Sequence, residues 1–204
     1  LHYHDWLWDL DFAQATKLFD DWLKRVPPAR GVVAWQPYPV TVRLINWCTF
    51  FLGRHRAETL AHGEFKVRLW HAFRQHAHFL SQSLEVHVGG HHLLENGVAL
   101  AFTGAYWAGE EAAAWRALGL AVMKAQLAEQ MLDDGTHYER SPMYHSRVLW
   151  LLLALQASGH PELQAYGDAH VHGAARAMRF MTHPDGELAL FNDSAFGIYT
   201  PPAK

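Results

Sequence analysis

The ten residues Asp133-Asp134-Gly135-Thr136-His137-Tyr138-Glu139-Arg140-Ser141-Pro142 separate two helical patterns and decide how this chain folds. Before them lies the alanine-rich run 110–132, and Gly135 suits the position just past the end of a helix. After them, Ser141 is a good N-cap and Pro142 suits the first helical position. The stretch therefore predicts two helices joined by a polar turn.

The same helical period extends over nearly all of the 204 residues. Apolar residues recur every three to four positions, and Pro, Gly or polar residues separate the segments. Trp35–Pro39 is expected to be a loop because it holds two prolines, and the short apolar run Leu188–Phe191 follows a turn, so little strand is expected. The pattern predicts about seven helices, at 11–25, 40–53, 57–83 with an interruption near Gly63, 91–107, 110–132, 141–158 and 161–181.

No segment repeats at a spacing of about 34 or 40 residues, which disfavours solenoids built from tetratricopeptide or HEAT repeats. Helical hairpins without a sequence repeat fit an α/α toroid or a helix bundle. No change in composition marks a domain boundary. We therefore expect residues 1–204 to be one all-α domain, or most of one.

Composition excludes several classes of protein. Half of the chain is apolar and 13% is aromatic, so it can bury a core and is not disordered. The net charge is −3 and no basic cluster lies on one face, which disfavours a nucleic-acid partner. The longest apolar run, Val148–Leu155, is far short of the roughly 20 residues of a membrane span. The single cysteine, Cys48, excludes an internal disulfide.

The chain begins with Leu1 rather than Met, so we expect a fragment or a processed product, and the lack of a signal peptide at its start says nothing about the parent protein. Its sixteen histidines are several times ordinary usage. His91 and Glu95 lie four residues apart, but the HExxH pattern is absent, so no metal site is predicted. GxSxG, P-loop and GxGxxG motifs are also absent, and no cofactor is expected. Half of the histidines are expected on polar helix faces: His55, His62, His71, His76, His78, His160, His170 and His172.

The first candidate site is the segment Gly89-Gly90-His91-His92-Leu93-Leu94-Glu95-Asn96. Two glycines allow a sharp turn, after which His91 and His92 lie in the first turn of a helix. His92, Asn96, Ala99 and Thr103 share a stripe of small and polar residues that could line a cleft. The alternative is a helix start with ordinary surface histidines.

The second candidate site lies at the start of the helix that follows Ser141. Tyr144 falls in its first turn, where free backbone N–H groups and the helix dipole favour an anion. Arg140 and His137 add positive charge. A phenol has a pKa of about 10, so a tyrosine that acts as a base needs such surroundings. The alternative is that Tyr144 packs and Arg140 pairs with Glu139.

Four stretches resemble motifs of heparinase II/III-like proteins. Trp35-Gln36-Pro37-Tyr38-Pro39-Val40-Thr41-Val42-Arg43-Leu44-Ile45-Asn46-Trp47 resembles their Trp-x-Pro-Tyr-Pro…Arg…Asn-Trp signature. Residues 90–96 are similar to their Gly-Asn-His segment, and residues 134–145 to the segment around their catalytic tyrosine. Phe191-Asn192-Asp193-Ser194 resembles the family's exit from its helical domain. The motifs follow the family's order over nearly the whole chain, and they indicate the family without indicating a substrate.

This resemblance implies an incomplete α/α toroid followed by an antiparallel β-sheet domain, which is absent from this chain. It also implies a periplasmic or secreted lyase that cleaves uronic-acid polymers such as heparan sulfate or alginate by β-elimination. In that reaction a base removes the proton on C5 while the uronate carboxylate is neutralised, and an acid protonates the C4 oxygen that leaves. A further catalytic residue is expected from the sheet domain, so this chain alone is expected to be inactive.

Carried over residue by residue, the resemblance makes Tyr144 the acid, with a second role as base also open. It makes His92 the group that neutralises the carboxylate or serves as the base. His91 stands where the family has asparagine, and it would neutralise with a pH dependence near 6.5. Arg43 and Asn46 lie three residues apart after the proline-rich loop. They are candidates for substrate contact, and an equally strong alternative is that they tie this loop to the scaffold. The predicted substrate contacts are Arg140, His137, His145, Asn46, Arg43, Glu95 and Asn96.

Two other functions stay open. One is an α/α-barrel glycoside hydrolase that uses two carboxylates, Glu95 with Glu139 or Asp134. The other is a toroid that binds glycans without catalysis, which the histidine at position 91 favours. The product separates the first two, because elimination leaves a conjugated double bond that absorbs ultraviolet light and hydrolysis does not.

Overall fold

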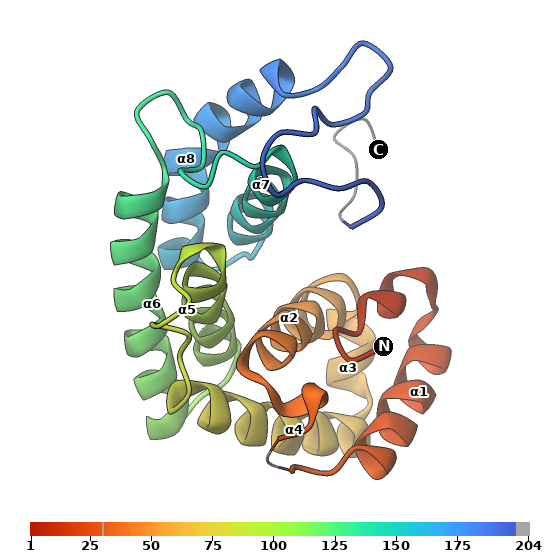
Figure 1. Cartoon of the computed structure of the whole chain (residues 1–204). Coiled ribbons are helices and arrows are strands. Elements are labelled where there is room, and N and C mark those ends of the chain that lie inside the picture. The colour runs from red at the N-terminus through yellow and green to blue at the C-terminus, as the bar shows by residue number, and fades with distance from the viewer. Residues whose placement is uncertain (30, 199–204) are drawn as a thin grey trace. The chain divides into compact units, whose positions relative to one another are not determined.

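The computed structural model describes residues 1–29 and 31–198, and their regular structure is almost entirely helical (Figure 1). In this described part no strand is assigned, and only two isolated bridges occur, Met131–His137 and Thr182–Leu188. The apolar run after Asp185 therefore contributes a single bridge. The chain forms two compact units, Leu1–Met123 and Lys124–Lys204.

The first unit holds most of the helices, and their starts follow from local sequence. Asp11 caps α1 by accepting a hydrogen bond from the backbone of Gln14 at 2.8 Å, and the Gln14 side chain bonds back to the Asp11 backbone. This reciprocal pair satisfies two N–H groups that a helix start would leave unpaired. The elements are η1 (Asp5–Asp9), α1 (Phe12–Arg25), η2 (Val33–Trp35), α2 (Pro37–Trp47), η3 (Cys48–Arg54), α3 (Arg56–Ala61), α4 (Gly63–Ser81), α5 (Gly90–Tyr106) and the first part of α6 (Glu110–Gln130).

The proline-rich segment is the main difference from the predicted elements. We expected a loop over 35–39, but α2 begins at Pro37. Proline has its φ fixed near the helical value and lacks only an N–H that the first turn cannot use. Two prolines in the first turn therefore start the helix. A π-helical turn, η3, continues α2 and completes the helix predicted to end at Gly53.

Aromatic side chains fill the core of the first unit. Trp47 on α2 is fully buried and meets Phe19 and Phe73 edge to face, at centroid distances of 5.0 and 5.6 Å. His76 is also fully buried between indoles, so its predicted place on a polar face is wrong. Burial lowers the pKa of His76 well below its usual value, because the charged ring would lose its water.

The stripe on α5 is buried as well. Asn96, Ala99 and Thr103 have no exposed surface, and Thr103 donates to the carbonyl of Ala99 at 2.8 Å. The helix is enclosed on nearly all sides, which its small residues allow. Of the four residues in the stripe, only His92 reaches an accessible surface, so the predicted lining of a cleft by this stripe is wrong.

Glycines let α5 and the first part of α6 pack closely, and this gives a stability prediction. A Cβ at Gly119 would lie 2.6 Å from the carbonyl oxygen of Gly97 and would overlap the backbone of Ala101. We expect Gly119→Ala to lower the free energy of unfolding by about 1–3 kcal/mol, because backbone atoms cannot move aside cheaply. Chemical denaturation measures this change. Gly63→Ala is the control, since nothing lies within 4 Å of its Cβ; an equal loss in both variants would contradict the packing argument.

The second unit contains the hairpin that the opening stretch predicted. α7 (Pro142–Gln156) and α8 (Pro161–Phe180) lie side by side in Figure 1. Ser141 caps α7 by accepting from the backbone N–H of Tyr144 at 3.2 Å, and Pro142 is the first helical residue, as predicted. A small core of Met143, Met178 and Leu188 joins the two helices to the chain beyond α8. Among the described residues, no helix is both long and apolar enough to cross a membrane.

Candidate active site

His91 and His92 lie in the first turn of α5, as the two glycines predicted. Gly89 and Gly90 have φ of 67° and 56°, a left-handed backbone that glycine adopts without strain. His91 is buried, with 5% of its surface exposed, whereas the side chain of His92 is 28% exposed. His92 is therefore the more accessible of the two rings.

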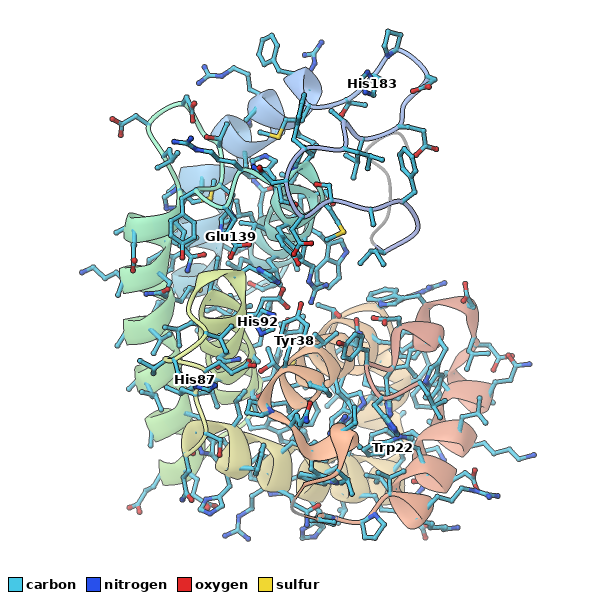
Figure 2. The ribbon with its side chains drawn as sticks, viewed as in Figure 1. Trp22, Tyr38, His87, His92, Glu139 and His183 are labelled. Carbon is cyan, nitrogen blue, oxygen red and sulfur yellow. The ribbon has the colours of Figure 1, made fainter. Side chains whose placement is uncertain are left out.

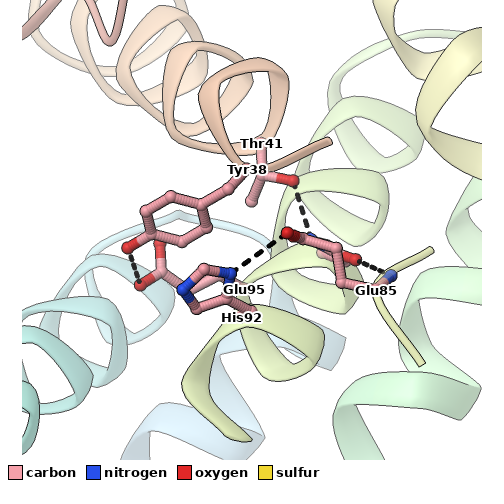
Figure 3. A network of polar contacts seen from close by, with 6 residues as sticks. Tyr38, Thr41, Glu85, His92 and Glu95 are labelled. Atoms are coloured by element: carbon pink, nitrogen blue, oxygen red, sulfur yellow. Dashed lines mark hydrogen bonds and ion pairs between the residues drawn. The ribbon is translucent and has the colours of Figure 1, made fainter. Parts of the chain in front are cut away.

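A buried carboxylate holds His92 (Figure 3). Glu85, in the loop between α4 and α5, accepts a hydrogen bond from Nδ1 of His92 at 3.1 Å. The other carboxylate oxygen accepts from Nδ2 of Asn96 at 2.9 Å, and the backbone N–H of Glu85 donates to Oδ1 of Asn96 at 2.8 Å. Nδ2 of Asn96 also donates to Oγ1 of Thr41 on α2, at 2.9 Å. These four residues tie the loop, α5 and α2 together around the histidine.

The network keeps Glu85 ionised. Burial raises the pKa of the Glu85 carboxyl, but hydrogen bonds from His92 and Asn96 outweigh it, and the charges of His92 and His87 add to their effect. The pKa of Glu85 therefore lies below its usual value. At neutral pH the group is a carboxylate that only accepts hydrogen bonds.

Tyr38 covers one face of His92. The two rings are stacked, with centroids 4.0 Å apart and planes 19° from parallel. The Tyr38 hydroxyl donates to Oε1 of Glu95 at 3.2 Å, and Glu95 has no exposed surface. Figure 2 shows Tyr38 on α2 facing His92 on α5. Stacking and the bond to Glu85 together fix the plane of the imidazole.

A pocket of about 660 Å³ opens beside this stack. Its walls come from the N-terminal segment, the start of α2 and the loop before α5. Neither lysine nor arginine is among its described lining residues, whereas the histidines His2, His87 and His92 are. The lining includes Tyr3, Gln36, Tyr38, Glu85, His87 and His92.

Arg43 and Asn46 hold the N-terminal segment rather than facing the pocket. Arg43 has no exposed surface, and its guanidinium donates to the carbonyls of His2 at 2.7 Å and Ala34 at 3.0 Å. Asn46 is 2% exposed and its Nδ2 donates to the carbonyl of Tyr3 at 2.9 Å. This placement favours the alternative in which both residues tie a loop to the scaffold. We leave them out of the proposed substrate contacts, and Asn96 with them, because its side-chain bonds go to Glu85 and Thr41.

Tyr144 lies in the second unit, in the first turn of α7 as predicted. Its ring packs against the core of Met143 and Met178. Its hydroxyl donates to Oδ2 of Asp193 at 2.7 Å. The phenol is thus held at both ends, by packing at the ring and by a carboxylate at the oxygen.

The segment that contains Asp193 is bound to the start of α7. Nδ2 of Asn192 donates to the carbonyl of Arg140 at 2.7 Å. The hydroxyls of Ser141 and Ser194 lie 2.9 Å apart, and the Ser141 hydroxyl also contacts the carbonyl of Asp193 at 3.0 Å. These contacts join residues about fifty positions apart and place Asp193 over Tyr144.

His137 and His145 are buried beneath the turn that leads into α7. His145 donates from Nε2 to the carbonyl of Ala174 on α8 at 2.9 Å, and its Nδ1 accepts from the backbone N–H of His137 at 3.2 Å. Nε2 of His137 lies 2.7 Å from Oε1 of Gln130. Burial lowers the pKa of His145, partly opposed by the bond to Ala174. Both histidines brace the turn, while Arg140, with φ of 56°, has an exposed side chain.

Asp134, one of the carboxylates considered for hydrolysis, lies in a turn and is bound by its neighbour Thr136. Asp134 accepts from the hydroxyl and backbone N–H of Thr136 at 2.6 and 2.8 Å, and these bonds lower its pKa. A glycosidase acid needs a raised pKa. Asp134 therefore suits a turn-forming role. In the described part of the chain, no three His, Cys, Asp or Glu side chains are grouped as metal ligands would be.

The predicted site residues thus form two groups. The first unit brings His92 together with His91, Glu95 and Asn96, and the second brings Tyr144 near Arg140. Sequence reasoning did not assign a role to Glu85 or Asp193. The paired glycines after Glu85 pointed only to the helix that follows them. Asp193 belonged to a quoted motif, but its contact with Tyr144 spans 49 residues.

Sequence and structure comparisons both relate this chain to heparinases and heparan sulfate lyases. A family model described as "Heparinase II/III N-terminus" matches residues 11–198. A heparin-sulfate lyase of Bacteroides stercoris is 26% identical over 178 residues, and the match covers 71% of this chain and 26% of that protein. The chain therefore spans about a quarter of that relative.

Two solved structures share the fold. A crystal structure of heparinase III matches with a TM-score of 0.65 at 18% identity, covering 91% of this chain and 31% of that one. A mutant of the heparan sulfate lyase HepC from Pedobacter heparinus matches with a TM-score of 0.61 at 19% identity, covering 92% and 32%. At such identities the likeness concerns the fold alone. It agrees with the prediction of an all-α domain of the incomplete α/α toroid class.

Proposed function

Because the chain belongs to the heparinase II/III family through its N-terminal domain, we propose that it is the helical part of a polysaccharide lyase. The proposed substrates are acidic glycans that contain uronic acids, and the proposed reaction is β-elimination. The observation that carries the proposal is the arrangement around His92. A partly exposed imidazole, fixed by a carboxylate and an aromatic ring, opens on a pocket large enough for sugar rings.

The reaction assigns a task to each group. A base removes the proton from C5 of the uronate, the C5–H electron pair forms the C4–C5 double bond, and the bond from C4 to its oxygen breaks. The leaving oxygen takes a proton from an acid, so charge and atoms balance. A neutralised carboxylate makes the C5 proton more acidic, because negative charge develops beside it. His92 is proposed to face the uronate as base or as partner of its carboxylate, and Tyr144 to act as the acid.

His91 is proposed to assist at the carboxylate. Its ring lies 4.6 Å from that of His92, centroid to centroid, and meets the edge of Tyr38 at 5.9 Å. Arg140 is retained as a proposed substrate contact because its side chain is exposed beside the start of α7.

Activity, substrate and compartment concern the whole protein, since this chain spans 26% of its curated relative. We propose that a β-sheet domain of the same protein completes the site. We further propose that the protein acts in the periplasm or outside the cell, where acidic polysaccharides are encountered.

The test is product formation by the full-length protein on a panel of acidic polysaccharides. We expect ultraviolet absorbance from the conjugated C4–C5 double bond, rising in step with new reducing ends. Reducing ends without absorbance would show hydrolysis and contradict elimination. Binding of a glycan without either product would indicate a binding protein that has lost the chemistry.

A further inference from the structure

The loop between α4 and α5 contributes a buried carboxylate, Glu85, that bonds to both His92 and Asn96. Glu85 is 7% exposed, and both of its carboxylate oxygens are used, one on His92 and one on Asn96. A buried carboxylate is costly unless it is fully hydrogen-bonded. Here the cost is offset by bonds that all converge on one imidazole and the amide behind it (Figure 3).

The backbone N–H of Glu85 fixes the direction of every hydrogen bond in this network. The backbone N–H of Glu85 can only donate, so the atom of Asn96 that faces it is Oδ1. Nδ2 of Asn96 then points the other way and donates both of its protons, to Glu85 and to Thr41. The carboxylate of Glu85 is left to accept from Nδ1 of His92, and this nitrogen must carry a proton.

We infer that Glu85 is a positioning residue that fixes His92 with its proton on Nδ1 and presents Nε2 to the substrate. The role of Nε2 toward a substrate rests on the proposed function, whereas the position of the proton on Nδ1 rests on the geometry alone. Among the described residues no group bonds to Nε2 of His92. A neutral ring held in this way has its lone pair on Nε2, which is the form that accepts a proton. When protonated, the same nitrogen donates, which is the form that binds a carboxylate.

The test is the tautomer of His92 in the full-length protein, labelled with ¹⁵N in its histidine side chains. Two-bond nitrogen–proton correlations distinguish Nδ1–H from Nε2–H, and the variant His92→Gln identifies the signals by their loss. We expect Nδ1–H in the neutral ring, whereas free histidine in water favours Nε2–H. An Nε2–H ring in the unaltered protein overturns the inference, whether or not the protein is a lyase.

The variant Glu85→Gln sharpens the test. Its amide oxygen must turn toward Nδ2 of Asn96, because two donors would otherwise face each other. The amide NH₂ then faces His92, and we expect the ring to change to the Nε2–H form. On a substrate from the panel, kcat should fall by about 10²–10⁴-fold with little change in KM, because a ring with its proton on Nε2 cannot accept a proton there.

A matched control is present in the chain. Glu58 accepts from Nδ1 of His55 at 3.0 Å on the surface of α3, in the same atomic arrangement. Glu58→Gln should leave the His92 signals and kcat unchanged. If Glu85→Gln keeps the Nδ1–H form and the full rate, Glu85 is not a positioning residue. If the tautomer changes as expected but no glycan is cleaved even by the unaltered protein, the proposed function fails and the inference stands.

Discussion

Replacing Tyr144 with phenylalanine in the full-length protein should reduce the rate of elimination by about 10²–10⁴-fold, the usual contribution of a general acid or base. The change removes one oxygen and leaves the ring against Met143 and Met178. The lost bond to Asp193 should cost only about 1 kcal/mol of stability. The measurement is ultraviolet product formation at saturating substrate, with circular dichroism to confirm the fold.

Tyr166→Phe is the control for this experiment. Tyr166 lies on α8 in the same unit and is also partly buried. It should retain the full rate, since nothing in the site depends on its hydroxyl. A Tyr144→Phe protein that keeps its rate within about tenfold would remove Tyr144 from the proposed chemistry.

Replacing Arg43 with methionine should have the largest effect on stability, a loss of about 2–5 kcal/mol in the free energy of unfolding. Arg43 has no exposed surface, and its guanidinium lies 4.4 Å from the ring centre of Trp22. Burial lowers the pKa of Arg43 to about 9, so it stays charged at neutral pH. Methionine fills much of the space but leaves the carbonyls of His2 and Ala34 without their donor.

Chemical denaturation followed by tryptophan fluorescence measures this loss. Arg25→Met is the control, because Arg25 is exposed and its pair with Asp21, at 2.8 Å, is a surface contact worth about 0.5 kcal/mol or less. A stable Arg43→Met protein would show that removing an uncompensated buried charge offsets the lost hydrogen bonds.

Local patterns predicted the helices well, and the reasons are local. Ser141 with Pro142, and Gly89 with Gly90, mark helix starts through their own backbone preferences. The proline-rich start of α2 was missed because proline both breaks a helix and begins one, and its neighbours decide which. Tyr144 and His92 were placed correctly in first turns for the same reason that their helices were predicted.

Contacts between residues far apart in the chain could not be predicted from the sequence pattern. The stripe of small residues on α5 looked polar enough to line a cleft, but its surroundings are other helices. Arg43 was predicted as a substrate contact from its spacing after the proline-rich loop, with tying that loop to the scaffold as an equal alternative. Its observed partners are backbone carbonyls, which every residue possesses, so no sequence pattern identifies them. Asp193 could not be paired with Tyr144, since no pattern along the chain encodes which carboxylate a distant hydroxyl will meet.

The bonds between residues 192–194 and the start of α7 have a consequence for how the protein is made. Asn192 holds the carbonyl of Arg140, and Ser194 holds the hydroxyl of Ser141, so the end of this region completes a structure begun fifty residues earlier. On the ribosome, α7 is translated long before its partners exist. A nascent chain can therefore complete the surroundings of Tyr144 only after Ser194 has emerged from the exit tunnel.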